Sequence, residues 1–101
     1  MIRGTTPTHT FLCDLKQEDI ENIYVTYEQR GQLMFEKTID DITFLDSGKG
    51  FVLRLTQEDT LKLDPKYSVE FQIRVKMKNG TALANEIMKR PVSDILKDEE
   101  I

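Results

Sequence analysis

The chain has 101 residues, of which 39% are hydrophobic and 32% are charged, and its formal net charge at pH 7 is −4. This length suits one domain, and the acidic balance argues weakly against nucleic acid as the default partner. Its single cysteine, Cys13, excludes an intramolecular disulfide and favours a reducing compartment. No apolar run approaches the roughly 20 residues of a membrane helix, and residues 1–7 lack the apolar stretch of a signal peptide.

The first half of the chain predicts five short strands. They span residues 8–13, 23–27, 32–39, 41–45 and 51–55. Apolar positions recur with a period of two in the second and third of these, which indicates one buried face. The side chains expected to point inward are Ile23, Val25, Tyr27, Leu33, Phe35 and Ile39. Turns are expected at Arg30-Gly31 and at residues 47–50, and Asp14 is expected to cap a short turn over residues 14–17.

Residues 67–77 carry the clearest strand pattern. Apolar side chains occupy every second position from Tyr67 to Met77, with polar side chains between them, as in a strand with one face on the core. Asn79-Gly80 follows, and this pair is the one best suited to a type I′ turn. The return strand is expected to run through Thr81, Leu83, Asn85 and Ile87. Pro91, which has no backbone N–H, is expected to end it.

The segment between residues 55 and 67 contains a helix-start signal. Thr56 and Asp59 have the spacing of a capping box, which predicts one helical turn over residues 57–62. Tyr67 stands where a sandwich strand can carry a structural corner tyrosine, whose hydroxyl binds the backbone upstream. An ordinary core tyrosine at the start of a strand fits the sequence equally well.

About seven short strands with frequent turn signals are typical of one architecture. We expect an all-β, immunoglobulin-like antiparallel β-sandwich with one or two short helical turns, as a single domain over residues 1–101. Residues 1–7 form an N-terminal arm. Residues 94–101 form an acidic C-terminal tail that carries Ile95, Leu96 and Ile101. Such ends either dock on a neighbouring protein as an interaction tail or fray.

The residue types that catalysis and metal binding require are scarce. The one histidine, His9, lies four residues from Cys13, and two ligands do not complete a structural zinc site. With Phe11 between them, these residues fit an inward-facing row. The aspartates at 40, 41, 46 and 64 lack the spacing of a calcium loop and fit turns. The sequence therefore predicts no enzyme, no cofactor and no catalytic or metal-binding residue.

Arg74, Lys76 and Lys78 form a candidate basic patch on the polar face of the 67–77 strand. Binding of single-stranded nucleic acid needs exposed aromatic side chains among such charges, whereas Tyr67 and Phe71 belong to the opposite face. A solvated sheet face, on which lysines discourage edge pairing, fits the pattern better. Nucleic acid is therefore not the expected partner.

Several segments resemble small proteins encoded by phages and prophages of Gram-positive bacteria. The resemblance lies in residues 1–8, 55–63, 69–75, 83–92 and 95–97. The chain is also similar to the N-terminal sandwich modules of some baseplate proteins, although it has no distal part. The resemblance implies a structural or adaptor role near a phage tail or baseplate, with phage structural proteins or further copies as partners. It also implies synthesis in the cytoplasm of the bacterial host, and residence there or in the virion.

Three functions therefore compete. The first is a phage-encoded structural or adaptor protein that works by protein–protein interaction. The second is a soluble regulatory protein that binds a host factor, for which the acidic surface would serve as the binding face. The third, with least support, is a nucleic-acid-binding sandwich that uses Arg74, Lys76 and Lys78.

Overall fold

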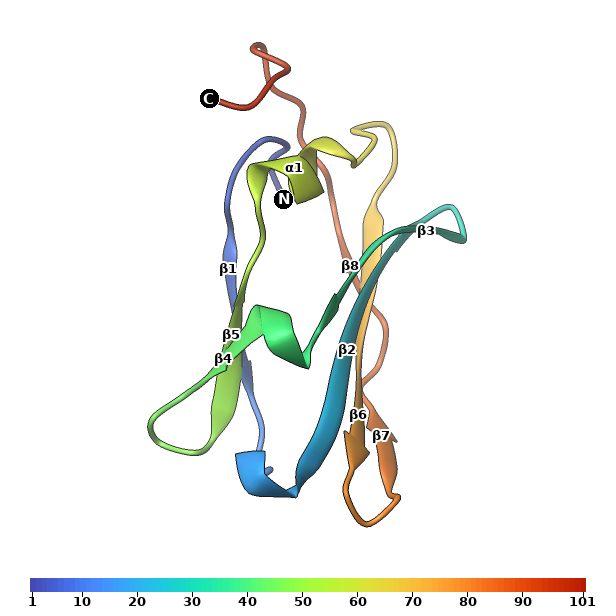
Figure 1. Ribbon diagram of the computed structural model, residues 1–101. Helices are drawn as coiled ribbons and strands as arrows, with labels where there is room; N and C mark the ends of the chain where they lie inside the picture. The colour runs from blue at the N-terminus through green and yellow to red at the C-terminus, as the bar shows by residue number, and fades with distance from the viewer.

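The computed structural model describes all residues, 1–101, as two antiparallel β-sheets that face each other (Figure 1). The smaller sheet has the strand order β1 (Thr8–Leu12), β5 (Gly50–Arg54), β4 (Ile42–Phe44). The larger sheet has the order β3 (Gln32–Thr38), β2 (Ile20–Gln29), β6 (Val69–Met77), and β6 also pairs with both β7 (Ala82–Ala84) and β8 (Met88–Arg90). The predicted mostly-β, sandwich-like architecture is confirmed.

The core lies between the sheets and is built from the alternate inward side chains of their strands. Ile23, Val25 and Tyr27 of β2 are fully buried, as the sequence predicts. The other buried strand residues include Phe35, Phe51, Leu53, Val69, Phe71, Ile73 and Val75. The period-two pattern therefore identified the buried face of both long central strands, β2 and β6.

The predicted inward position of Leu33 is wrong, because β3 contains a bulge. Tyr27 of β2 pairs with Phe35, but the next residue, Glu28, pairs with Leu33. Met34 is therefore left without a partner in the ladder. The extra residue shifts the alternation by one, and the Leu33 side chain is 60% exposed.

The hairpin between β6 and β7 does not have the predicted type I′ turn. That turn needs positive φ at both central residues, whereas φ is positive at Gly80 (93°) and not at Asn79. The Gly80 N–H donates to the Met77 carbonyl at 3.0 Å, and the Met77 N–H donates to the Thr81 carbonyl at 2.8 Å. The loop therefore has three residues, with glycine in the left-handed position.

The predicted single return strand is divided into β7 and β8 at Asn85. Between the pairs Arg74–Ala84 and Phe71–Met88, the return chain has one residue more than β6. Asn85 bridges the break, because its Oδ1 accepts a backbone N–H of β6 at 2.8 Å. A side chain thus replaces a main-chain carbonyl in the ladder.

Two short helical segments lie close to their predicted positions. α1 (Gln57–Leu61) begins with the predicted capping box, in which the Thr56 N–H donates to Asp59 Oδ2 at 2.9 Å and the Asp59 N–H donates to Thr56 Oγ1 at 3.1 Å. η1 (Gln17–Asp19) joins β1 to β2, but no side chain caps it, so the cap predicted at Asp14 is wrong.

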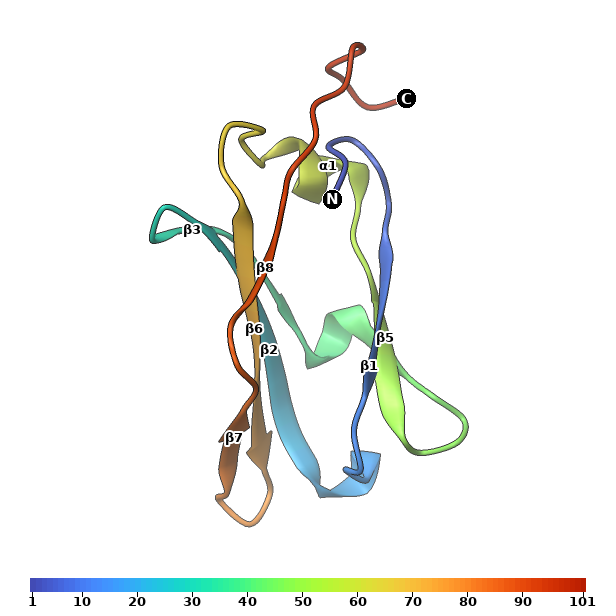
Figure 2. The same cartoon turned by 180° about the vertical axis from the view of Figure 1, so that it is seen from behind.

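The two long sides of the sandwich differ. On one side η2 (Ile39–Asp41), which the sequence assigned to strand and turn, crosses from β3 to β4 (Figure 1). A second capping box fixes it, with the Thr38 N–H donating to Asp41 Oδ2 at 2.8 Å. On the other side no segment crosses between β1 and β8 at mid-height (Figure 2). At mid-height the chain therefore crosses between the sheets on one side of the sandwich, and we call the other side the open side.

The two ends of the chain are bound to each other beside α1 (Figure 1). Ile2 forms a parallel bridge with Ser93. The Arg3 guanidinium donates to two carbonyls at the C-terminal end of α1 at 2.8 and 3.0 Å. It also forms ion pairs with Asp94 at 2.8 Å and Asp98 at 2.9 Å. The N-terminal arm and the start of the acidic tail therefore belong to one hydrogen-bonded cluster.

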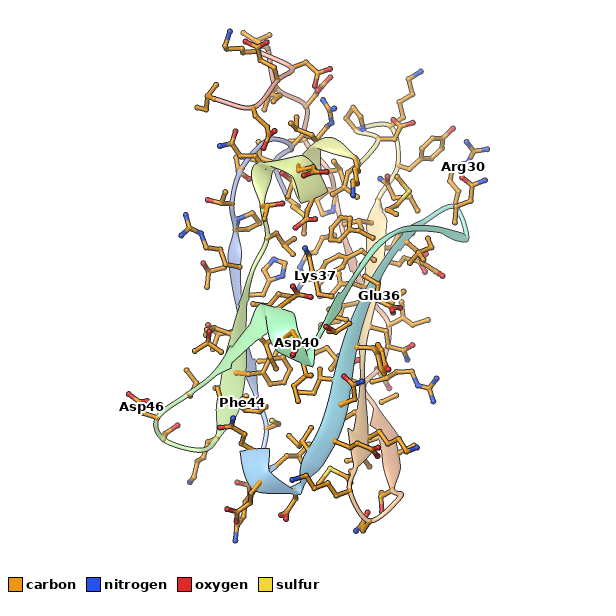
Figure 3. The ribbon with its side chains drawn as sticks, viewed as in Figure 1. Arg30, Glu36, Lys37, Asp40, Phe44 and Asp46 are labelled. Carbon is orange, nitrogen blue, oxygen red and sulfur yellow. The ribbon has the colours of Figure 1, made fainter.

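Gln29, at the end of β2, holds the loop that leads into β6. Its side chain is buried, and Nε2 donates to the carbonyls of Asp64 at 2.8 Å and Tyr67 at 2.9 Å. Its Oε1 accepts the Asp64 N–H at 2.8 Å. Tyr67 does not form the corner that was one of its two expected roles, because its hydroxyl has no hydrogen-bond partner. The residue is 38% exposed, and the centre of its ring lies 4.6 Å from the Arg30 guanidinium carbon. Figure 3 shows Arg30 at the outer tip of the β2–β3 hairpin.

Replacing Gln29 with alanine is expected to lower the free energy of unfolding by about 1–2 kcal/mol, because two carbonyls and one N–H of the loop lose the partners that the buried Gln29 side chain provides. The matched control is Gln32→Ala, an exposed glutamine of the same hairpin, with an expected change below about 0.5 kcal/mol. Urea unfolding of both variants measures the difference. Equal effects of the two substitutions would contradict the role of Gln29.

Candidate protein-binding surface

β1 is an edge strand, and its hydrogen bonds show which of its residues face β5. β1 pairs with β5 alone. The Leu55 N–H donates to the Pro7 carbonyl at 3.0 Å, and the Cys13 N–H donates to the Lys49 carbonyl at 3.1 Å. In an antiparallel ladder the main-chain groups of successive residues point to opposite sides. The odd-numbered residues from 7 to 13 therefore bind β5, and the even-numbered ones face outward.

Three residues of β1 thus present their main chain to solvent. The N–H and C=O groups of Thr8, Thr10 and Leu12 point away from β5, and the Leu12 side chain is 79% exposed. Pro7 does not block this edge, because its missing N–H falls on the β5 side. Natural proteins protect sheet edges with charges, prolines or bulges, and the outward side of β1 has none of these between Thr8 and Leu12.

The other three sheet edges carry such protection. β3 has the bulge at Met34 and the charged side chain of Lys37. β4 has three residues and follows directly on η2. The β7–β8 edge consists of two three-residue strands interrupted at Asn85, and Pro91 follows it. β1 is therefore the one unprotected edge of the sandwich.

An apolar groove runs beside β1 along the open side of the sandwich. Its volume is about 330 Å³, and 10 of the 12 residues that line it are hydrophobic. The lining includes Phe11, Leu12, Cys13, Leu15, Phe51, Ile73, Leu83 and Met88. We call Thr8, Thr10 and Leu12 together with these groove residues the β1 surface. The β1 surface thus combines unpaired main-chain groups with an apolar groove.

His9 anchors β1 to the opposite sheet. Its Nδ1 lies 3.1 Å from the hydroxyl of Tyr27 on β2. Burial lowers the pKa of His9 below its ordinary value, and the positive charge of Arg90 lowers it further. Burial raises the pKa of Tyr27, so the tyrosine stays protonated. The two neutral groups of His9 and Tyr27 therefore hold β1 in place. Cys13, on the same face of the strand as His9, packs against the core.

Stability is expected to fall as the pH drops below the ordinary His9 pKa of 6.5. In that range the unfolded chain binds a proton at His9 more readily than the folded chain does, so the free energy of unfolding rises with pH. The measurement is urea unfolding between about pH 5 and pH 7.5, for the wild type and for His9→Gln. The variant should show the shallower pH dependence, and identical slopes would contradict the assignment.

The predicted basic residues lie together but among opposite charges. Arg74 and Lys76 are exposed on the outer face of β6, and Lys78 follows in the exposed turn. Tyr24 of β2 lies opposite Arg74 in the ladder. The sequence did not indicate this neighbour, because only the pairing of β2 with β6 brings the two residues together. Lys76 Nζ lies 3.9 Å from a carboxylate oxygen of Glu21. This face is therefore mixed in charge and gives nucleic acid little support.

The three apolar tail residues have different surroundings. Ile95 packs against Gly4, where a Cβ atom would lie 2.7 Å from Ile95 Cδ1. Leu96 and Ile101 are exposed, although the Ile101 N–H donates to Gln57 Oε1 at 2.8 Å. Ile95 therefore belongs to the folded chain, and the other two side chains remain in solvent.

The remaining findings concern metals, membranes and relatives. Nowhere do three or more His, Cys, Asp or Glu side chains gather in an arrangement that could hold a metal ion. None of the helical segments has the length and apolar character to cross a membrane.

No protein-family model matches the chain, and no curated protein matches it in sequence.

Proposed function

We propose that this chain is a structural or adaptor protein that binds other proteins through the β1 surface. The observation that carries the proposal is the single unprotected strand edge, Thr8–Leu12, beside an apolar groove. An added strand gains affinity from main-chain hydrogen bonds, and an adjacent apolar groove selects its alternate side chains. Both parts of such a site serve binding, and neither requires a reactive group.

We also propose that the connectivity is immunoglobulin-like. In that fold one sheet has the order A-B-E-D, and the other carries C, F and G, with C′ added beside C in variable-type domains. The order β1-β5-β4 fits B-E-D, and the order β3-β2-β6-β7 fits C′-C-F-G. No strand of this chain takes the place of A, which pairs with B. A strand from another protein can therefore complete the smaller sheet at β1.

The resemblance to small phage proteins supports a partner in the phage particle, near the tail or baseplate. The test is mass spectrometry of particles purified from phage-induced cells that encode the protein, with the lysate as control. Two alleles are compared, the wild type and Thr10→Pro, which removes an outward N–H that β5 does not use. We expect the wild type at fixed stoichiometry and the variant depleted from particles.

Two outcomes would contradict this proposal in different ways. A protein that is abundant in the lysate but missing from particles would overturn the structural role, and the host-factor function would replace it. Equal incorporation of Thr10→Pro would keep the particle role but exclude the β1 surface as the contact. Circular dichroism of both purified proteins controls for loss of folding.

A further inference from the structure

We propose that the occupant of the β1 surface is β1 of a second copy, paired antiparallel about a two-fold axis at Thr10. This inference rests on the proposed function, because it names the partner of the same surface. The two smaller sheets would then join into one continuous sheet across the axis. The argument uses the main chain, the side chains and the charges of β1 in turn.

The main chain of β1 is complementary to itself. Outward N–H and C=O groups occur at Thr8, Thr10 and Leu12, symmetrically about Thr10. In the two-fold arrangement Thr10 lies opposite Thr10 of the second copy, and Thr8 lies opposite Leu12. Each of these is a hydrogen-bonded pair of an antiparallel ladder, so every outward group on the three residues finds a partner.

The side chains of β1 also fit this register. On the outer face, Leu12 of one copy packs on Thr8 of the other, which covers the most exposed apolar side chain of the strand. On the inner face His9 lies opposite Phe11 of the second copy, an aromatic pair of the kind that stabilises sheets. No two like charges face each other between Thr8 and Leu12, although each chain has a net charge of −4.

A positive and a negative side chain lie on opposite sides of the axis. The alternation of exposure continues beyond the strand to Thr6 at one end and to Asp14 at the other. The same register places Thr6 opposite Asp14 of the second copy. Arg54 Nη2 lies 3.3 Å from Thr6 Oγ1, so the guanidinium already stands beside the position that this carboxylate would take.

Neither charge has a partner within the chain, because the five ion pairs of the structure involve other residues. Two symmetric ion pairs between Arg54 and Asp14 would therefore form across the axis. A foreign strand could use the same main-chain groups, but a second copy would also bring its Asp14 to Arg54 and its Arg54 to Asp14. This symmetry favours self-association over an unrelated peptide.

The test is sedimentation velocity of the purified chain from about 1 µM to about 200 µM. We expect a monomer–dimer equilibrium in the wild type, and monomer throughout the range for Thr10→Pro. Arg54→Glu should raise the dimer Kd about tenfold, because it places two carboxylates together. The double variant Arg54→Glu/Asp14→Arg should return the Kd to within about threefold of the wild type, because the opposite pairing is restored.

Both charge variants change exposed residues, so they keep the test decisive if Thr10→Pro fails to fold. A wild type that stays monomeric overturns the dimer, and so does a double variant no tighter than Arg54→Glu alone. The proposed function is judged separately by incorporation into particles. A monomeric wild type whose incorporation depends on Thr10 would overturn the dimer and leave the proposed function standing.

Discussion

Replacing Asp59 with alanine is expected to lower the free energy of unfolding by about 3–5 kcal/mol, because it leaves a largely buried ammonium without its counter-ion. Asp59 is 6% exposed, and its Oδ2 lies 2.8 Å from Lys37 Nζ. The same oxygen accepts the Thr56 N–H at 2.9 Å. One carboxylate thus joins the start of α1 to β3. Burial alone would raise the pKa of Asp59, but hydrogen bonds from Lys37 and Thr56 outweigh it and lower that pKa.

The matched control for Asp59 is Asp40→Ala, an exposed aspartate on η2. Figure 3 shows Lys37 on β3 and Asp40 on η2. Urea unfolding should show a change below about 0.5 kcal/mol for the control. Adding Lys37→Met to Asp59→Ala should recover part of the loss, because no unpaired charge remains. If Asp59→Ala costs no more than Asp40→Ala, the ion pair does not hold α1 to the sheet.

Gly50→Ala is expected to lower the free energy of unfolding by about 3–4 kcal/mol, through steric conflict rather than lost contacts. Gly50 has φ 149°, and a Cβ atom there would lie 2.2 Å from the Phe11 carbonyl oxygen and 3.1 Å from Leu12 Cα. Both atoms belong to the backbone of β1. The strand would therefore have to move away from β5, and the groove would change shape with it.

Gly48→Ala separates this conflict from the general cost of replacing a turn glycine. Gly48 has φ 72°, but no atom lies within 4 Å of its added Cβ. Thermal unfolding should show a loss of about 1–2 kcal/mol for Gly48→Ala, from backbone strain alone. Similar losses for the two variants would show that β1 and β5 can separate without cost at Gly50.

Local patterns were sufficient to predict the long strands and the cap of α1. The alternation in β2 and β6 identified their buried faces, and the spacing of Thr56 and Asp59 located α1. Arg30 and Gly31, where a turn was predicted, have φ values of 54° and 73°, the positive values that a tight hairpin turn requires. In each case the signal and the structure lie within a few residues of each other.

Other features were not predicted because strand pairing is irregular there or because a side chain binds a distant backbone group. The bulge at Met34 shifted Leu33 outward, and Asn85 replaced a carbonyl in the ladder of β6. Gln29 binds a loop that lies 35 residues further along the chain. None of these changes the hydrophobic pattern. The edge position of β1 was equally hidden, because it depends on the order of strands in the sheet rather than on the sequence of β1.

The parallel bridge between Ile2 and Ser93 determines how the sandwich would respond to a pulling force on its two ends. Both ends of the chain lie beside α1 (Figure 1). Tension would therefore break the bridge and the hydrogen bonds and ion pairs of Arg3 one after another. After these contacts break, tension on the N-terminus acts on the hydrogen bonds between β1 and β5. A partner strand along the other edge of β1 would have to be broken at the same time. Binding at β1 would therefore reinforce the first strand that tension on the N-terminus reaches.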